Sequence, residues 1–242
     1  MIHRLLKFIE RKKFFRTSFK EFQTLSKLNN RFDIKWTDKF PCLYDNTENT
    51  VFDFWYVNHL AWAARVIAKI KPEIHVDISS SLYFCTMLSA FFPVKFYDYR
   101  PAKLNLSNLD TEHADLTKLS FENNSIKSLS CMHVIEHIGL GRYGDPIDPD
   151  GDLKAISELK RVLAQGGSLL FVVPLGRPRI QFNAHRIYSY DQIIGYFSDF
   201  KLEEFALIPD NGDMEGIVYN APRELVDTQS YGCGCFWFRK QD

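Results

Sequence analysis

The sequence predicts an α/β fold with a mostly parallel sheet, and three observations support this prediction. Residues 125–134 alternate small polar and apolar side chains, as expected for a short strand. Apolar residues then recur at helical spacing from Leu153 to Leu163. Ser168–Val173 is an almost unbroken apolar run, which is typical of a strand covered on both faces. Strand, helix and buried strand in this order form a βαβ crossover, in which the two strands run parallel.

The remaining elements extend this pattern in both directions along the chain. The aromatic and alanine-rich segment Phe52–Ile70 predicts a helix that ends before Pro72. Asp152 is expected to cap the helix of the crossover, and Gly166-Gly167 to end it. The other expected elements are strands Ile74–Ile78 and Val94–Tyr99 around a helix at Leu82–Phe92, a helix at Tyr190–Phe197, and closing strands at Lys201–Ile208 and Cys235–Arg239. Together they predict a sheet of about seven strands with helices on both faces.

Length and composition limit the class of protein. A chain of 242 residues with 45% apolar content can bury one sizeable core, which we place at residues 51–242. The 30 basic and 30 acidic residues cancel, so we expect no nucleic-acid partner. The 5 cysteines show no CxxC spacing, which argues against a structural zinc site and favours reduced thiols in a cytoplasmic protein.

Residues 1–50 are predicted to form a helix and an irregular extension in front of this domain. Basic residues outnumber acidic ones in residues 1–24, and apolar residues recur among them at roughly helical spacing. One interpretation is a basic amphipathic helix on an anionic membrane surface, which would put the protein at the inner face of the membrane. The other is a helix packed on the domain, with its lysines simply facing water.

Acidic residues stand at the predicted strand ends. Asp77 closes the first strand and Asp98 the second, and Asp115 with Leu116 follows the third. Ligands of parallel α/β sheets bind beyond the carboxyl ends of the strands, so we expect these residues at one edge of the sheet.

These features together resemble the class I S-adenosylmethionine-dependent methyltransferases. In that superfamily the acid after the second strand binds the ribose hydroxyls, and the acid after the third lies near the adenine amine. The passages LSFENNSIKSLSCMHVIEHI and ELKRVLAQGGSLLFVVP resemble those of the type 11 methyltransferases. The resemblance covers residues 74–173 and implies a Rossmann-like fold. It also implies S-adenosylmethionine as the cofactor, with Asp77, Asp98 and Asp115 among its contacts.

The turn after the first strand departs from the pattern of the superfamily. Ser79, Ser81 and Tyr83 stand where its members have glycines, which allow close approach to the cofactor. The hydroxyl and amide groups of Ser79, Ser80 and Ser81 suit either capping of the next helix or contact with the cofactor. Tyr83 is expected to fill part of the pocket for the methionine group.

Candidate catalytic residues follow the fourth strand, beside the position that the resemblance gives to the methyl group. They are His133, Glu136 and His137. Transfer to a hydroxyl needs a general base, and a histidine suits this role near neutral pH, so His133 is the candidate base. The alternative is that Glu136 and His137 only begin a helical turn and hydrogen-bond the loop.

Substrate-binding residues are predicted in two places. Arg142 and Tyr143 lie in the loop GLGRYGDPIDPDGD, and His185 and Arg186 follow the fifth strand. Basic side chains there suit an anionic or sugar-nucleotide acceptor. The aspartates of the loop lack the closing glutamate of a calcium loop and are explained by turn chemistry, so we predict no metal.

Several passages also resemble an uncharacterised family of bacterial and nematode proteins, some of whose bacterial members belong to surface-polysaccharide gene regions. These passages are HVDISSSL, YDYRP and HVIEHIGLGRYGDP. The leading hypothesis is a methyltransferase that acts on a small or glycan-linked acceptor. The alternative is a non-catalytic Rossmann-like module for polysaccharide assembly that has lost the cofactor. A sugar-nucleotide enzyme is a third, weaker hypothesis.

Overall fold

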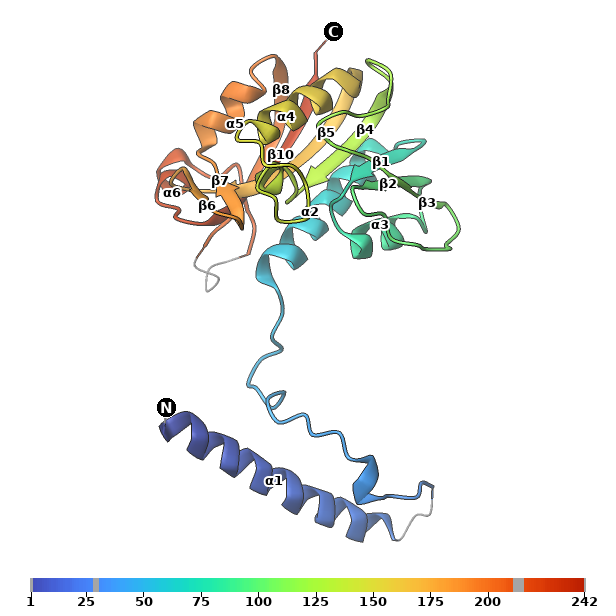
Figure 1. The fold of residues 1–242 in the computed structure, drawn as a ribbon, viewed down its shortest axis with the longest axis vertical. Coiled ribbons are helices and arrows are strands. Elements are labelled where there is room, and N and C mark those ends of the chain that lie inside the picture. The colour runs from blue at the N-terminus through green and yellow to red at the C-terminus, as the bar shows by residue number, and fades with distance from the viewer. Residues whose placement is uncertain (1, 28–30, 211–215, 242) are drawn as a thin grey trace. The chain divides into compact units, whose positions relative to one another are not determined.

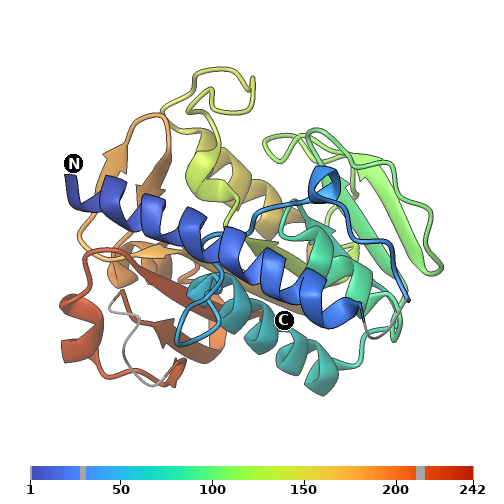
Figure 2. The same cartoon turned by 90° about the horizontal axis from the view of Figure 1, so that it is seen from below.

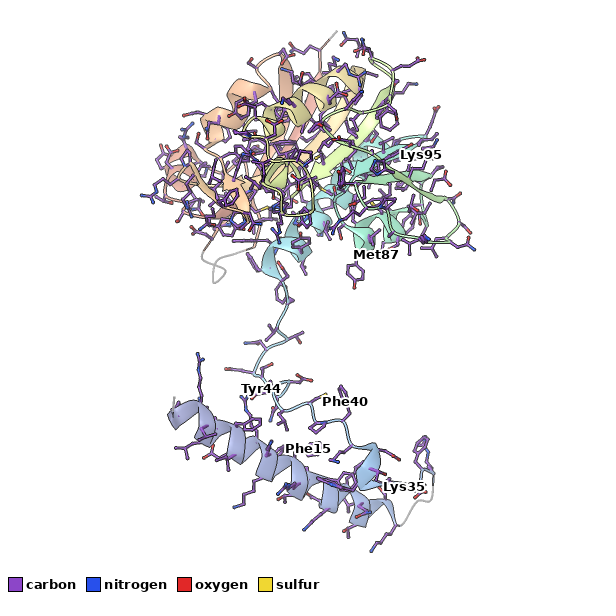
Figure 3. All side chains as sticks on the ribbon, in the orientation of Figure 1. Phe15, Lys35, Phe40, Tyr44, Met87 and Lys95 are labelled. Atoms are coloured by element: carbon purple, nitrogen blue, oxygen red, sulfur yellow. The ribbon has the colours of Figure 1, made fainter. Side chains whose placement is uncertain are left out.

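The computed structural model describes residues 2–27, 31–210 and 216–241, and the chain divides into two compact units, Met1–Phe52 and Asp53–Asp242. The first unit contains the helix α1 (Ile2–Ser26) and the short 3-10 helix η1 (Trp36–Asp38). The ring of Trp36 contacts Phe15 and Phe19 of α1, with centroids 6.0 and 4.9 Å apart. Figure 3 labels Phe15 on this helix. Aromatic contacts therefore hold the extension against its own helix.

The helix α1 is less amphipathic than the spacing of its apolar residues predicted. Phe8, Phe15 and Phe19 form one stripe at the helical period. Leu6 and Phe14 fall outside this stripe and are 53% and 65% exposed, so apolar side chains surround the helix. None of the helices in the described part of the chain has the length and apolar character needed to cross a membrane.

The second unit is built on one large sheet with the strand order β3-β2-β1-β4-β5-β10-β8-β9 (Figure 1). Its strands are β1 (His75–Ile78), β2 (Val94–Asp98), β3 (Leu109–His113), β4 (Ile126–Met132), β5 (Leu163–Leu175), β8 (Phe200–Ile208), β9 (Val218–Tyr219) and β10 (Gly232–Lys240). The first five strands pair in parallel, and β10 runs antiparallel to both β5 and β8. The predicted fold class and the antiparallel closing pair are confirmed.

The sheet has 8 strands, one more than predicted, because the short strand β9 pairs with β8 at its edge. A separate two-stranded sheet joins β6 (Arg179–Gln181) and β7 (His185–Ile187). The segment 209–232, which the sequence left without a predicted fold, contains β9 and the helix α6 (Arg223–Asp227). Part of it, residues 211–215, lies outside the described residues.

Helices cover both faces of the sheet, and each face has its own hydrophobic core. The helices α2 (Phe54–Ile70) and α3 (Leu82–Leu88) pack on one face. The helices α4 (Gly151–Val162) and α5 (Tyr190–Tyr196) pack on the other (Figure 2). Alternate residues of β5 enter the two cores: Phe171 and Val173 face α4, and Val172 faces α2. This is why the strand has an almost continuous apolar sequence.

Several predicted boundaries are wrong. The helix α4 is capped at Asp150 and ends at Val162, so Asp152 lies within its first turn. Gly166-Gly167 does not end that helix but lies inside β5, whose register with β4 shifts nearby. The helix α3 stops at Leu88, four residues before the predicted end at Phe92.

Candidate active site

The carboxyl ends of β1 to β4 meet at one edge of the sheet, and β10 begins at the same edge because it runs antiparallel to β5. The loops leaving these ends enclose a pocket of about 710 Å³, counting the part open to solvent. Its lining combines predicted cofactor residues (Ser79, Asp115, Leu116) with His137 and Tyr143 from the predicted catalytic and substrate groups. We call the first set the donor side and the second the acceptor side.

The serine turn of the donor side keeps a backbone conformation that favours glycine. Ser79 has a φ of 55°, and both its N–H and its hydroxyl donate to the carbonyl of Tyr97, at 2.7 and 3.2 Å. Tyr83 is 81% exposed and is absent from the lining of the pocket, so the expected filling of the methionine site is wrong. Serine hydrogen bonds therefore hold a turn that glycine would form without strain.

Asp77 lies beneath this turn and not in the pocket lining. Its carboxylate accepts hydrogen bonds from the N–H of Ser80 at 3.0 Å and from the hydroxyl of Ser130. Burial raises the pKa of Asp77 to about 6, against the lowering effect of these hydrogen bonds. His75 is buried beside it, between the hydroxyls of Ser128 and Ser130 at 2.8 and 2.9 Å. The sequence did not indicate this polar network, because its members come from two different strands.

The other two acids at the strand ends are oriented by their own loops, and of these Asp115 lines the pocket whereas Asp98 lies outside its lining. Asp98 accepts a hydrogen bond from the N–H of Arg100 at 2.6 Å. Asp115 accepts from the N–H and the hydroxyl of Thr117, at 2.9 and 2.7 Å. Leu116 is buried and lines the pocket. Each carboxylate is thus fixed at a strand end by groups two residues further along the chain.

The loop after β4 is organised by Asp145. Its carboxylate accepts from the N–H groups of Gly139 (2.7 Å), Gly141 (3.3 Å) and Tyr143 (3.1 Å). Gly139 has a φ of +79°, and a Cβ there would lie 2.0 Å from the carbonyl oxygen of Asp148, so only glycine fits.

The remaining acids of the loop point to separate partners. Asp148 pairs with Lys154 at 2.6 Å, and Asp152 accepts from the hydroxyl of Tyr188 at 2.9 Å. These contacts agree with the prediction that turn and packing contacts account for the loop aspartates.

His137, on the 3-10 helix η2 (Ile135–His137), is the histidine that faces the pocket. Its Nδ1 lies 2.6 Å from the carbonyl of Ala184, which also accepts from Arg142 at 3.0 Å. The guanidinium of Arg142, which only donates, also lies 3.3 Å from Nδ1, but the carbonyl, which only accepts, is the nearer partner. The nearer contact assigns the proton to Nδ1 and leaves the lone pair on Nε2. Nε2 lies 3.9 Å from Oε1 of Glu136, and the ring of Tyr143 contacts the imidazole edge-on, with centroids 5.6 Å apart.

His133 and Glu136 lie outside the pocket lining, in a buried cluster that sequence reasoning missed. Nδ1 of His133 lies 2.9 Å from Oε1 of Glu136, and its Nε2 lies 3.3 Å from the sulfur of Cys233 at the start of β10. The ring of His59, from α2, is 5.0 Å away from that of His133. Both nitrogens of the predicted base are thus engaged. The cluster joins residues from three distant segments, so no local spacing could reveal it.

Burial and neighbouring groups shift the pKa values of this cluster in different directions. Burial lowers the pKa of His133, but Cys233 and Glu136 outweigh this effect and raise that pKa to about 10. Burial raises the pKa of the Cys233 thiol well above its ordinary value. Burial, helped by the nearby His133, lowers the pKa of His59 to about 3. Cys233-Gly234-Cys235, expected as a turn before a strand, lies within β10, where Gly234 pairs with Val173 and Leu207.

The two predicted substrate residues of β7 have different positions. His185 stacks on Tyr231 with centroids 4.9 Å apart and lies 6.4 Å from the ring of His137. Arg186 is buried, and its guanidinium donates to the carbonyls of Ile138 (2.6 Å) and Pro149 (3.0 Å). Arg186 therefore fixes the loop after β4, and the prediction that it contacts the acceptor does not fit its position.

Comparison with known proteins identifies the fold. A family model described as "Caenorhabditis protein of unknown function, DUF268" matches residues 105–205. No curated protein sequence matches the chain.

Solved structures match most of the second unit. The YcgJ protein of Bacillus subtilis is 14% identical, covering 76% of this chain and 98% of that one, with a TM-score of 0.54. The Burkholderia thailandensis 1,6-didemethyltoxoflavin-N1-methyltransferase, solved with S-adenosylhomocysteine, is 12% identical, covering 78% and 82%, with a TM-score of 0.53. The 4+2 cyclase SpnF is 12% identical, covering 80% and 85%, with a TM-score of 0.53. The fold is that of the class I S-adenosylmethionine-dependent methyltransferases.

Proposed function

We propose that the protein is an S-adenosylmethionine-dependent methyltransferase that acts on a small or glycan-linked acceptor. The observation that carries this proposal is the single pocket shared by the donor and acceptor sides at the carboxyl edge of the sheet. Methyl transfer needs mainly the alignment of donor and acceptor, and one pocket that holds both meets this need. The methyltransferase fold and the S-adenosylhomocysteine bound by the Burkholderia enzyme favour the same cofactor here.

On the donor side, Asp98 and Asp115 are the proposed contacts of the cofactor. Both carboxylates stand at strand ends, and each already accepts a hydrogen bond from its own loop. The left-handed turn at Ser79 brings backbone close to the place where the methionine group would lie. Asp77, buried beneath the turn, acts as a positioning residue that fixes Ser80 and not as a direct contact.

On the acceptor side, His137 replaces His133 as the proposed general base. Its Nε2 keeps a lone pair and its ring lines the pocket, whereas both nitrogens of His133 are engaged. Glu136, 3.9 Å away, would stabilise the imidazolium that forms when His137 accepts the proton of the acceptor.

The groups around His137 favour a polar acceptor with a ring. Arg100 and Arg142 each lie over the ring of Tyr143, at 4.7 and 5.1 Å. Tyr99 also lines the pocket and is 40% exposed. Aromatic faces and guanidinium groups together suit a sugar or an anionic ring compound. A role in surface-polysaccharide synthesis is part of the proposal and rests on the sequence resemblance.

Calorimetric titration of the full chain with S-adenosylhomocysteine tests the cofactor. We expect saturable binding at one site per chain. The variant Asp98→Ala should weaken it about 10- to 100-fold, because hydrogen bonds to charged groups contribute about 1.5–3 kcal/mol. Asp110→Ala, an exposed acid on the neighbouring strand β3, is the matched control and should bind as the wild type does.

The absence of binding in the wild type would reject the methyltransferase proposal. It would favour the alternative of a Rossmann-like module without a cofactor. The likeness to SpnF, named as a cyclase, supports keeping this alternative in the test, because one fold carries different functions. Equal affinities for the wild type and Asp98→Ala would reject the assigned cofactor contacts.

A further inference from the structure

Three metal-ligating side chains converge behind the pocket. His59 comes from the middle of α2, His133 follows β4, and Cys233 opens β10. One ligand atom of each lies within 4.8 Å of the other two. His59 and Cys233 are fully buried, and the side chain of His133 is 10% exposed. A metal–nitrogen distance of about 2.0 Å and a metal–sulfur distance of about 2.3 Å fit a triangle of this size after small side-chain movements.

Both histidines have the outer hydrogen bonds of metal ligands. Nδ1 of His59 lies 2.8 Å from the carbonyl of Trp55, and Nδ1 of His133 lies 2.9 Å from the carboxylate of Glu136. Since both partners only accept, each Nδ1 carries a proton, which leaves Nε2 as the nitrogen of each ring that binds a metal when deprotonated. Carbonyl and carboxylate partners are the groups that usually orient metal-bound histidines.

The charge of Glu136 also indicates a missing cation. The residue is 1% exposed, and its Oε2 is the one buried side-chain polar atom of the described residues without a hydrogen-bond partner. Its Oε1 pairs with Nδ1 of His133 at 2.9 Å, but a buried carboxylate is costly when only one of its oxygens has a partner. A divalent ion, a Cys233 thiolate and the Glu136 carboxylate would sum to zero charge.

We propose that His59, His133 and Cys233 bind one zinc ion, with Glu136 as the outer partner of His133. Imidazole and thiolate ligands select zinc over magnesium or calcium, which prefer oxygen. When the ion binds, a sulfur–zinc bond replaces the S–H bond of Cys233, a nitrogen–zinc bond replaces any N–H bond at Nε2 of His133, and the displaced protons pass to solvent. Three protein ligands leave a fourth position for water or a small oxygen or sulfur ligand. The zinc site shares Glu136 with the proposed methyl transfer, since its Oε1 lies near both His133 and His137, but zinc binding itself needs no S-adenosylmethionine.

A cysteine nucleophile activated by His133 and Glu136 is the competing interpretation of the same contacts. It needs an accessible sulfur, but Cys233 has no exposed surface. It also gives no role to His59. The Nδ1 of that ring is occupied by the carbonyl of Trp55, so Nε2 is the atom that remains for the cluster. Zinc binding accounts for all three residues and for the outer partners.

Zinc titration of the reduced, chelator-treated full chain, in competition with a chromophoric chelator, tests the site. We expect one zinc per chain in the wild type. Cys233→Ser should lose this binding. Glu136→Gln should weaken it about 10- to 100-fold, as substitutions of outer partners do. Cys131→Ser is the matched control, since Cys131 is also a buried free cysteine but lies on the other face of the sheet.

Cobalt substitution keeps the test decisive if a variant fails to fold. The wild type with cobalt should show the thiolate-to-cobalt charge-transfer absorption of a cysteine ligand. Its absence, or zinc affinities equal in the wild type and Cys233→Ser, would overturn the proposal. Rapid alkylation of Cys233 in a protein that retains no zinc would overturn it in favour of the nucleophile. The result does not depend on S-adenosylhomocysteine binding, so the two proposals can fail separately.

Discussion

The donor and acceptor sides of the pocket are built in different ways. On the donor side, Asp77, Asp98 and Asp115 each accept from a backbone N–H two or three residues away. Asp77 adds one contact to a distant segment, the hydroxyl of Ser130, whereas the side chains of the histidines after β4 rely on such contacts: His137 with Ala184, and His133, outside the pocket lining, with Cys233. Short-range contacts form wherever the local sequence allows them. Long-range contacts exist only once the whole sheet has formed, so the acceptor side depends on the complete fold.

The two sides also differ in what a substitution should change. Asp98 and Asp115 keep exposed surface, so their loss should affect ligand binding more than stability. Glu136 and Cys233 are buried, and Arg186 is buried with its guanidinium on backbone carbonyls of the loop. Removing one partner of a buried polar contact costs stability directly. Stability and binding measurements can therefore separate the two sides.

The largest loss of stability is expected from a substitution in the loop after β4, on the acceptor side of the pocket. Gly139→Ala should destabilise the protein by about 3 kcal/mol or more, since left-handed strain costs about 1–2 kcal/mol and overpacking about 1–3 kcal/mol. The added Cβ would meet the carbonyl oxygen of Asp148 at 2.0 Å. Gly144 lies in the same loop at a φ of +85°, but a Cβ added there would meet no atom within 4 Å. Gly144→Ala should therefore lose only the stability that left-handed strain costs. Urea unfolding measures both, and equal losses would show that the close contact does not matter.

The architecture of the second unit could be predicted because it depends on periodicity. Continuous apolar runs at 168–173 and helical spacing at 153–163 result from burial on a sheet, and the structure has both elements. The wrong predictions of element boundaries occur where the pattern of apolar side chains does not determine the local structure. Gly166-Gly167 reads as a helix stop, yet the helix has already ended at Val162, and the two glycines lie where the register between β4 and β5 shifts, with Gly166 at a φ of 66°. The two-residue strand β9 is too short to leave a periodic signal.

The candidate site could be predicted only in part, for the same reason. The acids at strand ends follow from topology, and the loop after β4 was found from its unusual composition. The choice between His133 and His137 needed the position of Cys233, which lies 100 residues after His133. His59 lies in an aromatic helix whose sequence gave no indication of a metal-ligating role. Which of two neighbouring histidines faces a pocket is a tertiary property, and local sequence does not contain it.

A smaller difference in stability should distinguish glycine substitutions at Ser79 and Ser80, the neighbouring serines of the turn after β1. Ser79→Gly relieves left-handed strain of about 1–2 kcal/mol, and this offsets both the lost hydrogen bond and the added chain entropy. Ser80→Gly relieves no strain and removes the hydroxyl that accepts from the N–H of Met132 at 3.0 Å. We expect Ser80→Gly to be less stable than Ser79→Gly by about 1 kcal/mol or more. The opposite order in urea unfolding would contradict the glycine-like role of Ser79.

The smallest effect concerns the pH dependence of stability through Asp77. Its pKa is raised by burial from 3.8 to about 6 in the folded protein. At low pH the carboxyl is protonated in both states, so its favourable contribution is then complete. As pH rises, the unfolded chain ionises first, and the contribution is lost progressively until pH passes about 6. Asp77→Asn cannot ionise, so its stability relative to the wild type should rise by about 1 kcal/mol between about pH 5 and about pH 8.

Urea unfolding of both proteins across this pH range measures the difference. Asp110→Asn removes one exposed carboxylate from β3 and reports the effect of net charge alone. A flat difference between Asp77→Asn and the wild type would mean that Ser130 and Ser80 stabilise the ionised form as well as water does. Asp77 would then carry its charge beneath the serine turn and add a negative field to the donor side. A rising difference would instead show that burial makes Asp77 harder to ionise than in water, and would place the costly buried groups of both sides beneath the pocket lining.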